Sequence, residues 1–290
     1  MTDTNDQSAV VIRAWNTVLF DKFLRFRHLV TSGLSGHSEE FFKRRPFPEG
    51  ARVLDVGCGF GDTTLEIAAL VGATGSAVGV DCAERFIAVA RQDAAETPLE
   101  NISFGVADVQ TGHLGGPYDQ AFSRFGTMFF SSPGAALMNV RRCLAPGGKL
   151  AFIVWRRRED NGWLHEAEQC VKRWLPVVSH AETDQVHCGP GPFSMAGADL
   201  VSQLLLSAGF RHIAFERVDQ PVCIGKDLNE ALEFALALGP AGEILRLAGH
   251  AAEDKQAEIR GALSETLRQF ERTDGVWGPS SAWLVTAENP

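Results

Sequence analysis

The sequence lacks the paired cysteines that hold a zinc ribbon or form a redox centre. Its six cysteines never stand as C-x-x-C, which excludes both a zinc ribbon and a thioredoxin-like pair. We therefore expect scattered, reduced thiols, as in a cytoplasmic protein, and no metal site. The cysteines are Cys58, Cys82, Cys143, Cys170, Cys188 and Cys223.

Long apolar runs and an excess of positive charge are missing as well. The start, Met1 to Ser8, is polar and acidic, whereas a secretory signal needs a basic region followed by an apolar one. The longest apolar runs, such as Leu150–Trp155, are far shorter than the roughly 20 residues that cross a bilayer. With 27 basic and 36 acidic residues, the net charge is −9, so the chain lacks the positive field that attracts proteins to the phosphate backbone of a nucleic acid. We expect a cytoplasmic protein without membrane insertion and without a nucleic-acid partner.

What is present is a globular composition with much glycine. Apolar residues make up 45% of the 290 positions and charged residues 22%, which excludes a disordered chain and allows one large or two modest domains. Glycine supplies 29 residues, above the roughly 7% that is usual. The position of these glycines therefore matters.

The hydrophobic pattern predicts a helical start followed by an α/β core. Apolar residues between Val10 and Phe42 recur at three- and four-residue intervals, which indicates helices. After Pro48, short apolar runs alternate with helical stretches, which is typical of βα units and a mostly parallel sheet. The expected strands are Arg52–Val56, Ala77–Val80, Ile102–Val106, Gln120–Phe125, Leu150–Trp155, Ile213–Val218 and Trp283–Ala287. The expected helices are Thr63–Val71, Glu84–Ala95, Gly134–Cys143, Asp199–Ala208, Leu228–Leu238 and Glu253–Arg272.

A glycine-rich turn follows the first expected strand. The sequence Val53–Gly61 reads VLDVGCGFG, with glycines at alternate positions before a helix that Asp62 opens. Glycine lets a ligand approach bare backbone, and free N–H groups at a helix start favour nucleotide-like ligands. Dinucleotide folds use G-x-G-x-x-G, whereas Asp62 stands here in place of the third glycine and would oppose a pyrophosphate. An NAD(P)-dependent oxidoreductase is therefore disfavoured.

Acidic residues stand at the carboxyl ends of the first three expected strands. Asp81 lies twenty residues beyond Gly61, where an acid can accept both hydroxyls of a ribose. Asp108 ends the next strand and is placed to receive an adenine amino group. With Asp55, these acids line one edge of the sheet.

These motifs, together with Leu144–Leu150 (LAPGGKL), resemble the class I S-adenosylmethionine-dependent methyltransferases. The resemblance covers roughly Arg52 to Trp155 and is to the small-molecule branch that includes the ubiquinone/menaquinone C-methyltransferases (methyltransferase type 11). It implies a Rossmann-like, seven-stranded sheet of order 3-2-1-4-5-7-6 with an antiparallel last strand. Trp283–Ala287 would be the inserted strand seven. Residues 1–48 would form a helical lid, and residues 49–290 a methyltransferase domain with insertions at about 156–198 and 219–281.

The same resemblance implies S-adenosyl-L-methionine as cofactor. Gly57 and Gly59 would contact its methionine part, Asp81 the ribose and Asp108 the adenine, with Val109 beside the ring. The predicted cofactor site also contains Asp55, Cys82 and Arg124.

The acceptor is less well defined. The loop after the fourth strand, Ser123–Phe130, lacks the Asn/Asp-Pro-Pro-Tyr/Phe motif of enzymes that methylate DNA bases or protein glutamine. Its aromatic residues suit a planar small molecule, and equally suit core packing. The predicted acceptor contacts are Trp15, Phe129, Trp163 and Phe193. The triplet Arg156–Arg158 would either pair an acidic group of the acceptor or form a solvated turn.

We expect methyl transfer to oxygen or carbon of a small, aromatic or planar acceptor by in-line displacement, which depends mainly on positioning. The catalytic residues are unknown, and a general base is optional; the candidates are His28, His165 and His187, besides His37 and His180. The alternatives are a non-catalytic S-adenosylmethionine-binding regulatory module and the oxidoreductase. The oligomeric state stays open, with a homodimer among the options.

Overall fold

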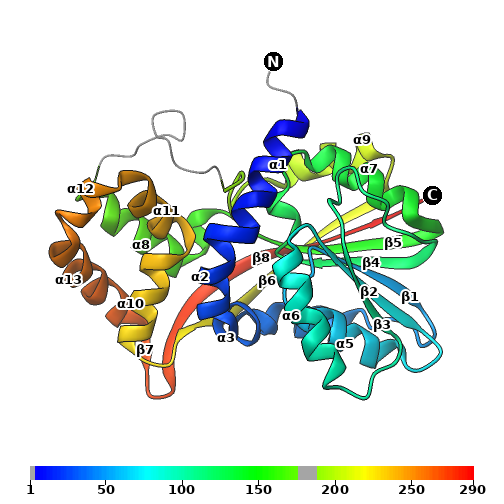
Figure 1. Cartoon of the computed structure of the whole chain (residues 1–290), viewed down its shortest axis with the longest axis horizontal. Coiled ribbons are helices and arrows are strands. Elements are labelled where there is room, and N and C mark those ends of the chain that lie inside the picture. Colours follow the sequence, from blue (N-terminus) through cyan, green and yellow to red (C-terminus); the bar gives the residue numbers. More distant parts are fainter. Residues whose placement is uncertain (1–3, 176–187) are drawn as a thin grey trace.

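A mixed sheet organises the protein, whose computed structural model describes residues 4–175 and 188–290 (Figure 1). The strand order is β3-β2-β1-β4-β5-β8-β6, and the short β7 pairs with β8. Strands β1 to β5 are parallel, whereas β8 runs antiparallel to both β5 and β6. The predicted order 3-2-1-4-5-7-6 is confirmed, with β8 as strand seven. The strands are β1 (Arg52–Val56), β2 (Ser76–Asp81), β3 (Ile102–Val106), β4 (Tyr118–Arg124), β5 (Leu144–Trp155), β6 (Arg211–Gly225), β7 (Glu271–Arg272) and β8 (Gly275–Glu288).

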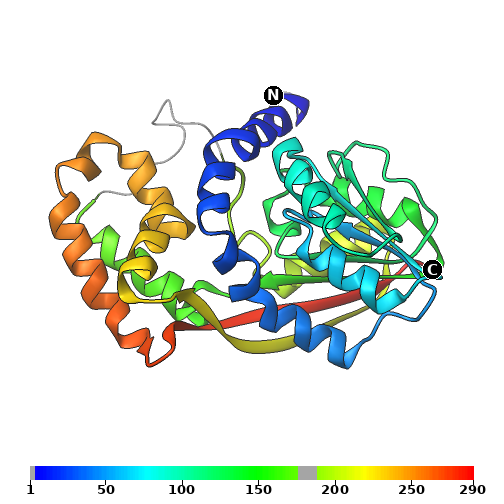
Figure 2. The ribbon, with the colours of Figure 1, turned by 60° about the horizontal axis from the view of Figure 1, so that its bottom comes forward.

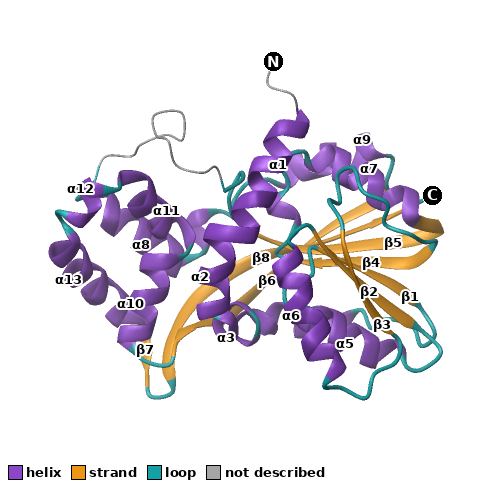
Figure 3. Ribbon diagram, viewed as in Figure 1, coloured by secondary structure: helices purple, strands orange, loops and turns teal. Residues whose placement is uncertain are grey.

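Helices cover the parallel part of the sheet (Figure 3). All residues of β1 after Arg52 are buried, as expected for a parallel strand covered on both faces. Helix α7 packs against α9, and α5 and α6 pack against β2 and β3. The helices are α5 (Asp62–Val71), α6 (Glu84–Ala95), α7 (Pro133–Cys143) and α9 (Ala198–Ala208).

Strands β6 and β8 are longer than the sequence predicted. They pair along their length, from Arg211 opposite Glu288 to Gly225 opposite Val276. They project beyond the other strands towards a separate group of helices, on the left in Figure 1. The start of the expected insertion at 219 therefore belongs to the sheet. The group comprises α8 (Gly162–Lys172), α10 (Leu228–Ala237), α11 (Gly239–Ala248), α12 (His250–Glu253) and α13 (Gln256–Leu267).

The helix predicted over Glu253–Arg272 is wrong in its bounds. Helix α13 ends at Leu267, and a 3₁₀ turn leads into β7, because the chain must turn back into β8. Gly275 opens β8 with φ = +136°, a conformation that favours glycine. Helix α11 was not predicted as a separate element.

The N-terminal helices run between the sheet and this helical group (Figure 2). Arg27 pairs with Asp93 on α6, and Arg25 lies 3.2 Å from Glu233 on α10, so the segment contacts both sides. The predicted helical start is confirmed. It consists of α1 (Thr4–Ala14), a π-helical turn (Trp15–Leu19), α2 (Phe20–Arg25), α3 (Arg27–Val30), a 3₁₀ turn (Ser32–Leu34) and α4 (Ser35–Arg44).

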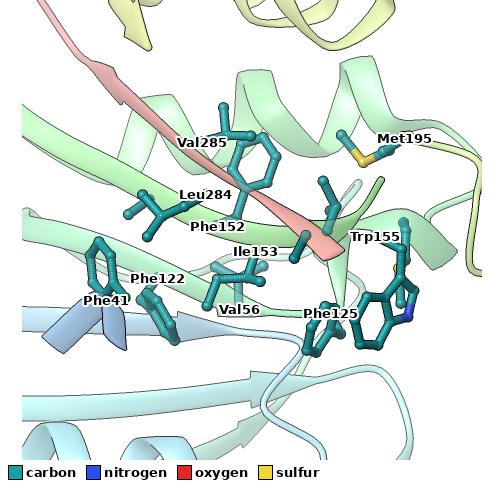
Figure 4. Packing of buried hydrophobic residues seen from close by; sticks show 14 of the residues in the cluster. Phe41, Val56, Phe122, Phe125, Phe152, Ile153, Trp155, Met195, Leu284 and Val285 are labelled. Atoms are coloured by element: carbon teal, nitrogen blue, oxygen red, sulfur yellow. The ribbon is translucent and has the colours of Figure 1, made fainter. Parts of the chain in front are cut away.

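The main core lies along β4, β5 and β8 (Figure 4). Phe41 of α4 stacks on Phe122 of β4, with ring centroids 5.1 Å apart. At the carboxyl ends of β4 and β5, Phe125 stacks on Trp155 at 3.9 Å. Phe125 is buried and has φ = +56°, and it closes the core where the strands meet the site.

Two further observations concern the described residues alone. None of their helices is long and apolar enough to cross a membrane. No disulfide joins any two of the six cysteines, all of which lie within the described ranges.

Candidate functional site

A cavity of about 620 Å³ lies at the carboxyl ends of the parallel strands. One half is formed by the glycine turn and the ends of β2, β3 and β4. The other half is formed by the N-terminal helices and the helical group. Residues that line it include Gly57, Gly59, Asp81, Cys82, Asp108, Val109, Arg124, Gly126, Trp15, Lys22, Phe129, Arg158, Trp163, Glu168, Phe234 and Ile244.

The glycine turn has a backbone that other residues rarely adopt. Gly57 and Gly59 have φ of +67° and +54°, and both line the cavity. A Cβ on Gly57 would lie 3.3 Å from the Cα of Gly126, so the turn is also closely packed. Helix α5 then begins at Asp62 with its free N–H groups near this turn. This arrangement leaves bare backbone facing the cavity.

Asp81 holds the turn and faces the cavity. The N–H of Gly59 donates to one carboxylate oxygen of Asp81 at 3.0 Å, and the N–H of Ala83 donates to the other at 2.9 Å. Burial raises the pKa of the Asp81 carboxyl. Each oxygen has a second lone pair, so the carboxylate can still accept hydroxyl donors. Cys82 lines the cavity beside it, and burial raises the pKa of its thiol.

Asp108 is bonded to the N-terminal helix. The hydroxyl of Ser8 on α1 donates to the Asp108 carboxylate at 2.7 Å, and the backbone N–H of Gln110 donates to its other oxygen at 2.9 Å. Val109 is buried and lines the cavity next to it. Ser8 was not among the predicted site residues, because nothing local in the sequence relates it to Asp108.

Asp55 is the one predicted cofactor residue that does not line the cavity, whereas Arg124 lines it and is held by an ion pair. Asp55 is 1% exposed and does not line the cavity; it accepts hydrogen bonds of 2.7 Å from the hydroxyls of Thr63 and Thr64. It thereby fixes the first turn of α5, and burial raises its pKa to about 6. Arg124 lines the cavity and forms an ion pair with Asp62.

Three of the four predicted acceptor residues line the cavity: Trp15, Phe129 and Trp163. Trp15 meets Phe129 edge-on at 5.0 Å, and Trp163 stacks on Phe234 at 5.8 Å. Phe193 does not line the cavity and lies instead 5.3 Å from the Arg158 guanidinium.

No histidine among the described residues lines the cavity. His28 is exposed and lies 3.3 Å from Glu230, and His165 lies on α8 outside the cavity. His37 is buried and packs at a steep angle against the rings of both Phe125 and Trp155, and burial lowers its pKa to about 4. The remaining two candidates, His180 and His187, fall outside the described residues.

The residues of the first half fit S-adenosylmethionine. The bare turn at Gly57 and Gly59 gives space for the methionine part, and Asp81 offers acceptors for ribose hydroxyls. Asp108 and Val109 line the same half and could receive an adenine. The acidic strand ends also suit a positively charged sulfonium better than a pyrophosphate.

Residues 53–148 match the family described as methyltransferase domain. Aklanonic acid methyltransferase from Streptomyces sp. (strain C5) is 36% identical over 104 residues, which are 36% of this chain and 47% of that protein. Demethylmenaquinone methyltransferase from Shouchella clausii is 32% identical over 120 residues, 40% of this chain and 49% of that protein. The chain therefore spans about half the length of these curated relatives.

The fold is shared with the YcgJ protein from Bacillus subtilis. Its crystal structure gives a TM-score of 0.55 at 16% identity and covers 86% of this chain and 96% of that one. The match over residues 53–148 shows that this part of the chain is similar to methyltransferase domains, in agreement with the strand order and the glycine turn.

Proposed function

We propose that the chain is a cytoplasmic methyltransferase that transfers a methyl group from S-adenosylmethionine to oxygen or carbon of a small, planar acceptor. One observation carries the proposal. A single cavity joins the glycine turn and Asp81 to an aromatic half with Trp15, Phe129 and Trp163. A methyl donor bound in the first half and an acceptor bound in the second would therefore be in direct contact, with no protein atoms between them.

Residues of the first half would bind and orient the cofactor. When bound, S-adenosylmethionine supplies an electrophilic methyl group on a positively charged sulfur. Gly57 and Gly59 allow close approach of the methionine part, and Asp81 accepts the ribose hydroxyls. Asp108 would accept the adenine amino group in place of the Gln110 side-chain amide, which donates to it at 3.0 Å, with Val109 against the ring. Arg124 holds Asp62 beside the turn.

Residues of the second half would position the acceptor and exclude water. Trp15 and Phe129 stand edge to face, and Trp163 is backed by Phe234, so a planar acceptor would lie against rigid aromatic surfaces. In-line displacement gains most of its acceleration from such positioning. The N-terminal helices, whose residues line both halves, would act as the predicted lid over the bound pair.

The other hypotheses have less support. The G-x-G-x-G turn and Asp62 count against NAD(P), and the named relatives are methyltransferases rather than oxidoreductases. A regulatory module without activity has no use for an open acceptor half beside the cofactor residues. We retain a small-molecule acceptor without a nucleic-acid partner as part of the proposal, and a homodimer remains a prediction.

Isothermal titration with S-adenosylhomocysteine and with NAD⁺ tests the cofactor. We expect binding of the first and none of the second; the reverse would refute the proposal. Incubation with methyl-labelled S-adenosylmethionine and a metabolite extract, followed by mass spectrometry, would then identify the acceptor. Cofactor binding without label transfer to any metabolite would favour the regulatory module.

A further inference from the structure

The charges around the acceptor half of the cavity are distributed unlike those of the whole chain. The chain has a net charge of −9, and the cofactor half carries Asp62, Asp81 and Asp108 against one arginine. Among the described residues, the charged side chains that line the acceptor half are Lys22, Arg158, Glu168 and Glu243. The charges of these two acids and two bases cancel, but the basic residues that pair with the acids add further positive charge.

Each of these two acids is paired by a base of its own helix. Both oxygens of Glu243 accept from Arg246 at 2.8 Å on α11. Glu168, whose side chain is 4% exposed, accepts from Lys172 at 2.8 Å on α8 and also from Arg158. Within the described residues, the charges of these groups and Lys22 therefore sum to an excess of positive charge.

Lys22 is the clearest source of this excess. It reaches from α2 to the end of α10, where its ammonium donates to the carbonyl of Ala237 at 3.0 Å. It forms no ion pair with a carboxylate in the described part of the chain. Burial, and then the like charge of Arg246, lower the pKa of Lys22, and the nearby Glu243 carboxylate only partly opposes them. A half-buried cation with two N–H donors to spare is stabilised by a bound anion.

Arg158 supplies a second cation at the same half. It lines the cavity, and only one side of its guanidinium is engaged by Glu168. Glu168 and the ring of Phe193, 5.3 Å away, hold the guanidinium in place. Its neighbour Arg157 is exposed and does not line the cavity.

We propose that the acceptor is an organic carboxylate with a planar apolar body, an inference that rests on the proposed function. Lys22 and Arg158 bind its carboxylate, and the aromatic residues around Trp163 and Phe234 take its body. Both are binding residues that select the acceptor, and neither takes part in the displacement itself.

Titration of 2-naphthoate and of neutral 2-naphthamide into the S-adenosylhomocysteine-loaded protein tests this. We expect the acid to bind about tenfold more tightly or better. Lys22→Met and Arg158→Met should each lower acid affinity about tenfold and leave amide affinity and S-adenosylhomocysteine affinity unchanged. Matched controls are Lys43→Met on the exposed side of α4 and Arg157→Met, which should retain the preference for the acid.

Equal binding of acid and amide, no binding of either, or a preference that survives both cavity variants would overturn the inference. Tighter binding of 1-naphthyl phosphate than of 2-naphthoate would also refute the carboxylate. Failure of the proposed function would be seen separately, as absence of S-adenosylhomocysteine binding in the first titration.

Discussion

Replacement of Asp81 by alanine tests the cofactor half most directly. The structure gives this carboxylate two backbone donors, Gly59 N–H and Ala83 N–H, at 3.0 and 2.9 Å. The variant therefore loses the acceptors for a ribose and also releases the turn that carries Gly59. Hydrogen bonds to a charged group contribute about 1.5–3 kcal/mol. We expect S-adenosylhomocysteine affinity to fall roughly 10- to 150-fold.

Two controls separate binding from folding. Asp81→Asn keeps the size and one acceptor oxygen, so its affinity should lie between those of the parent and Asp81→Ala. Asp119→Ala removes an exposed carboxylate that also accepts from a backbone N–H, that of Arg52 at 2.8 Å, away from the cavity. Its affinity should equal that of the parent. Isothermal titration measures the affinities, and thermal unfolding shows whether each variant is folded. A folded Asp81→Ala protein with parental affinity would refute the assignment of Asp81.

The other predictions concern stability and closure. Because burial raises the pKa of Asp55 from 3.8 to about 6, the folded chain keeps a proton that the unfolded chain loses as pH rises from 4 to 6. Ionisation of Asp55 should thus lower the free energy of unfolding by about 3 kcal/mol as pH rises over this range. In urea unfolding, Asp55→Asn should lack this pH-dependent loss of stability, and a variant with the same pH dependence as the parent would contradict the prediction. Gly61→Ala should destabilise by about 1–3 kcal/mol in urea unfolding, since its Cβ would lie 2.7 Å from the Phe104 ring at φ = +81°. Gly147→Ala is the control, because Gly147 has a similar φ of +76° but open space around it, so that only backbone strain is tested. If Gly147→Ala lost as much stability as Gly61→Ala, the contact with Phe104 would not be the cause. Ser8→Ala removes a hydrogen bond of about 1 kcal/mol to Asp108, so S-adenosylhomocysteine should dissociate about fivefold faster in stopped-flow measurements; a parental rate would show that α1 does not retain the cofactor.

The parallel core could be predicted closely because its signals are local. β1, β3 and α6 have the bounds that the sequence predicted, since each stands beside a turn or a helix start. The length of β6 and β8 could not be predicted in the same way. Pro221 and Pro279 interrupt their patterns and read as turns, yet they face each other in the paired strands.

Residues of the cofactor half were predicted from spacing along one short segment. Gly57, Gly59 and Asp81 line the cavity as the motif implies. The exception is Asp55, which shares the strand-end pattern but points into the core, where Thr63 and Thr64 engage it. An acid that faces the cavity differs from one that fixes a helix in which way its side chain points, and the spacing of residues in the sequence does not show this.

The acceptor half is assembled from segments far apart in the chain. Lys22 meets Ala237 through a contact that no local pattern indicates, and the same holds in the cofactor half for Ser8 and Asp108. The family match, by contrast, ends at residue 148, before α8, α10 and α11 begin. The family match therefore covers the part that would bind the cofactor and stops before α8, α10 and α11, which line the acceptor half. For this reason, the acceptor has to be inferred from the charges and rings of this chain, and Lys22 and Arg158 carry more weight there than any relative's substrate.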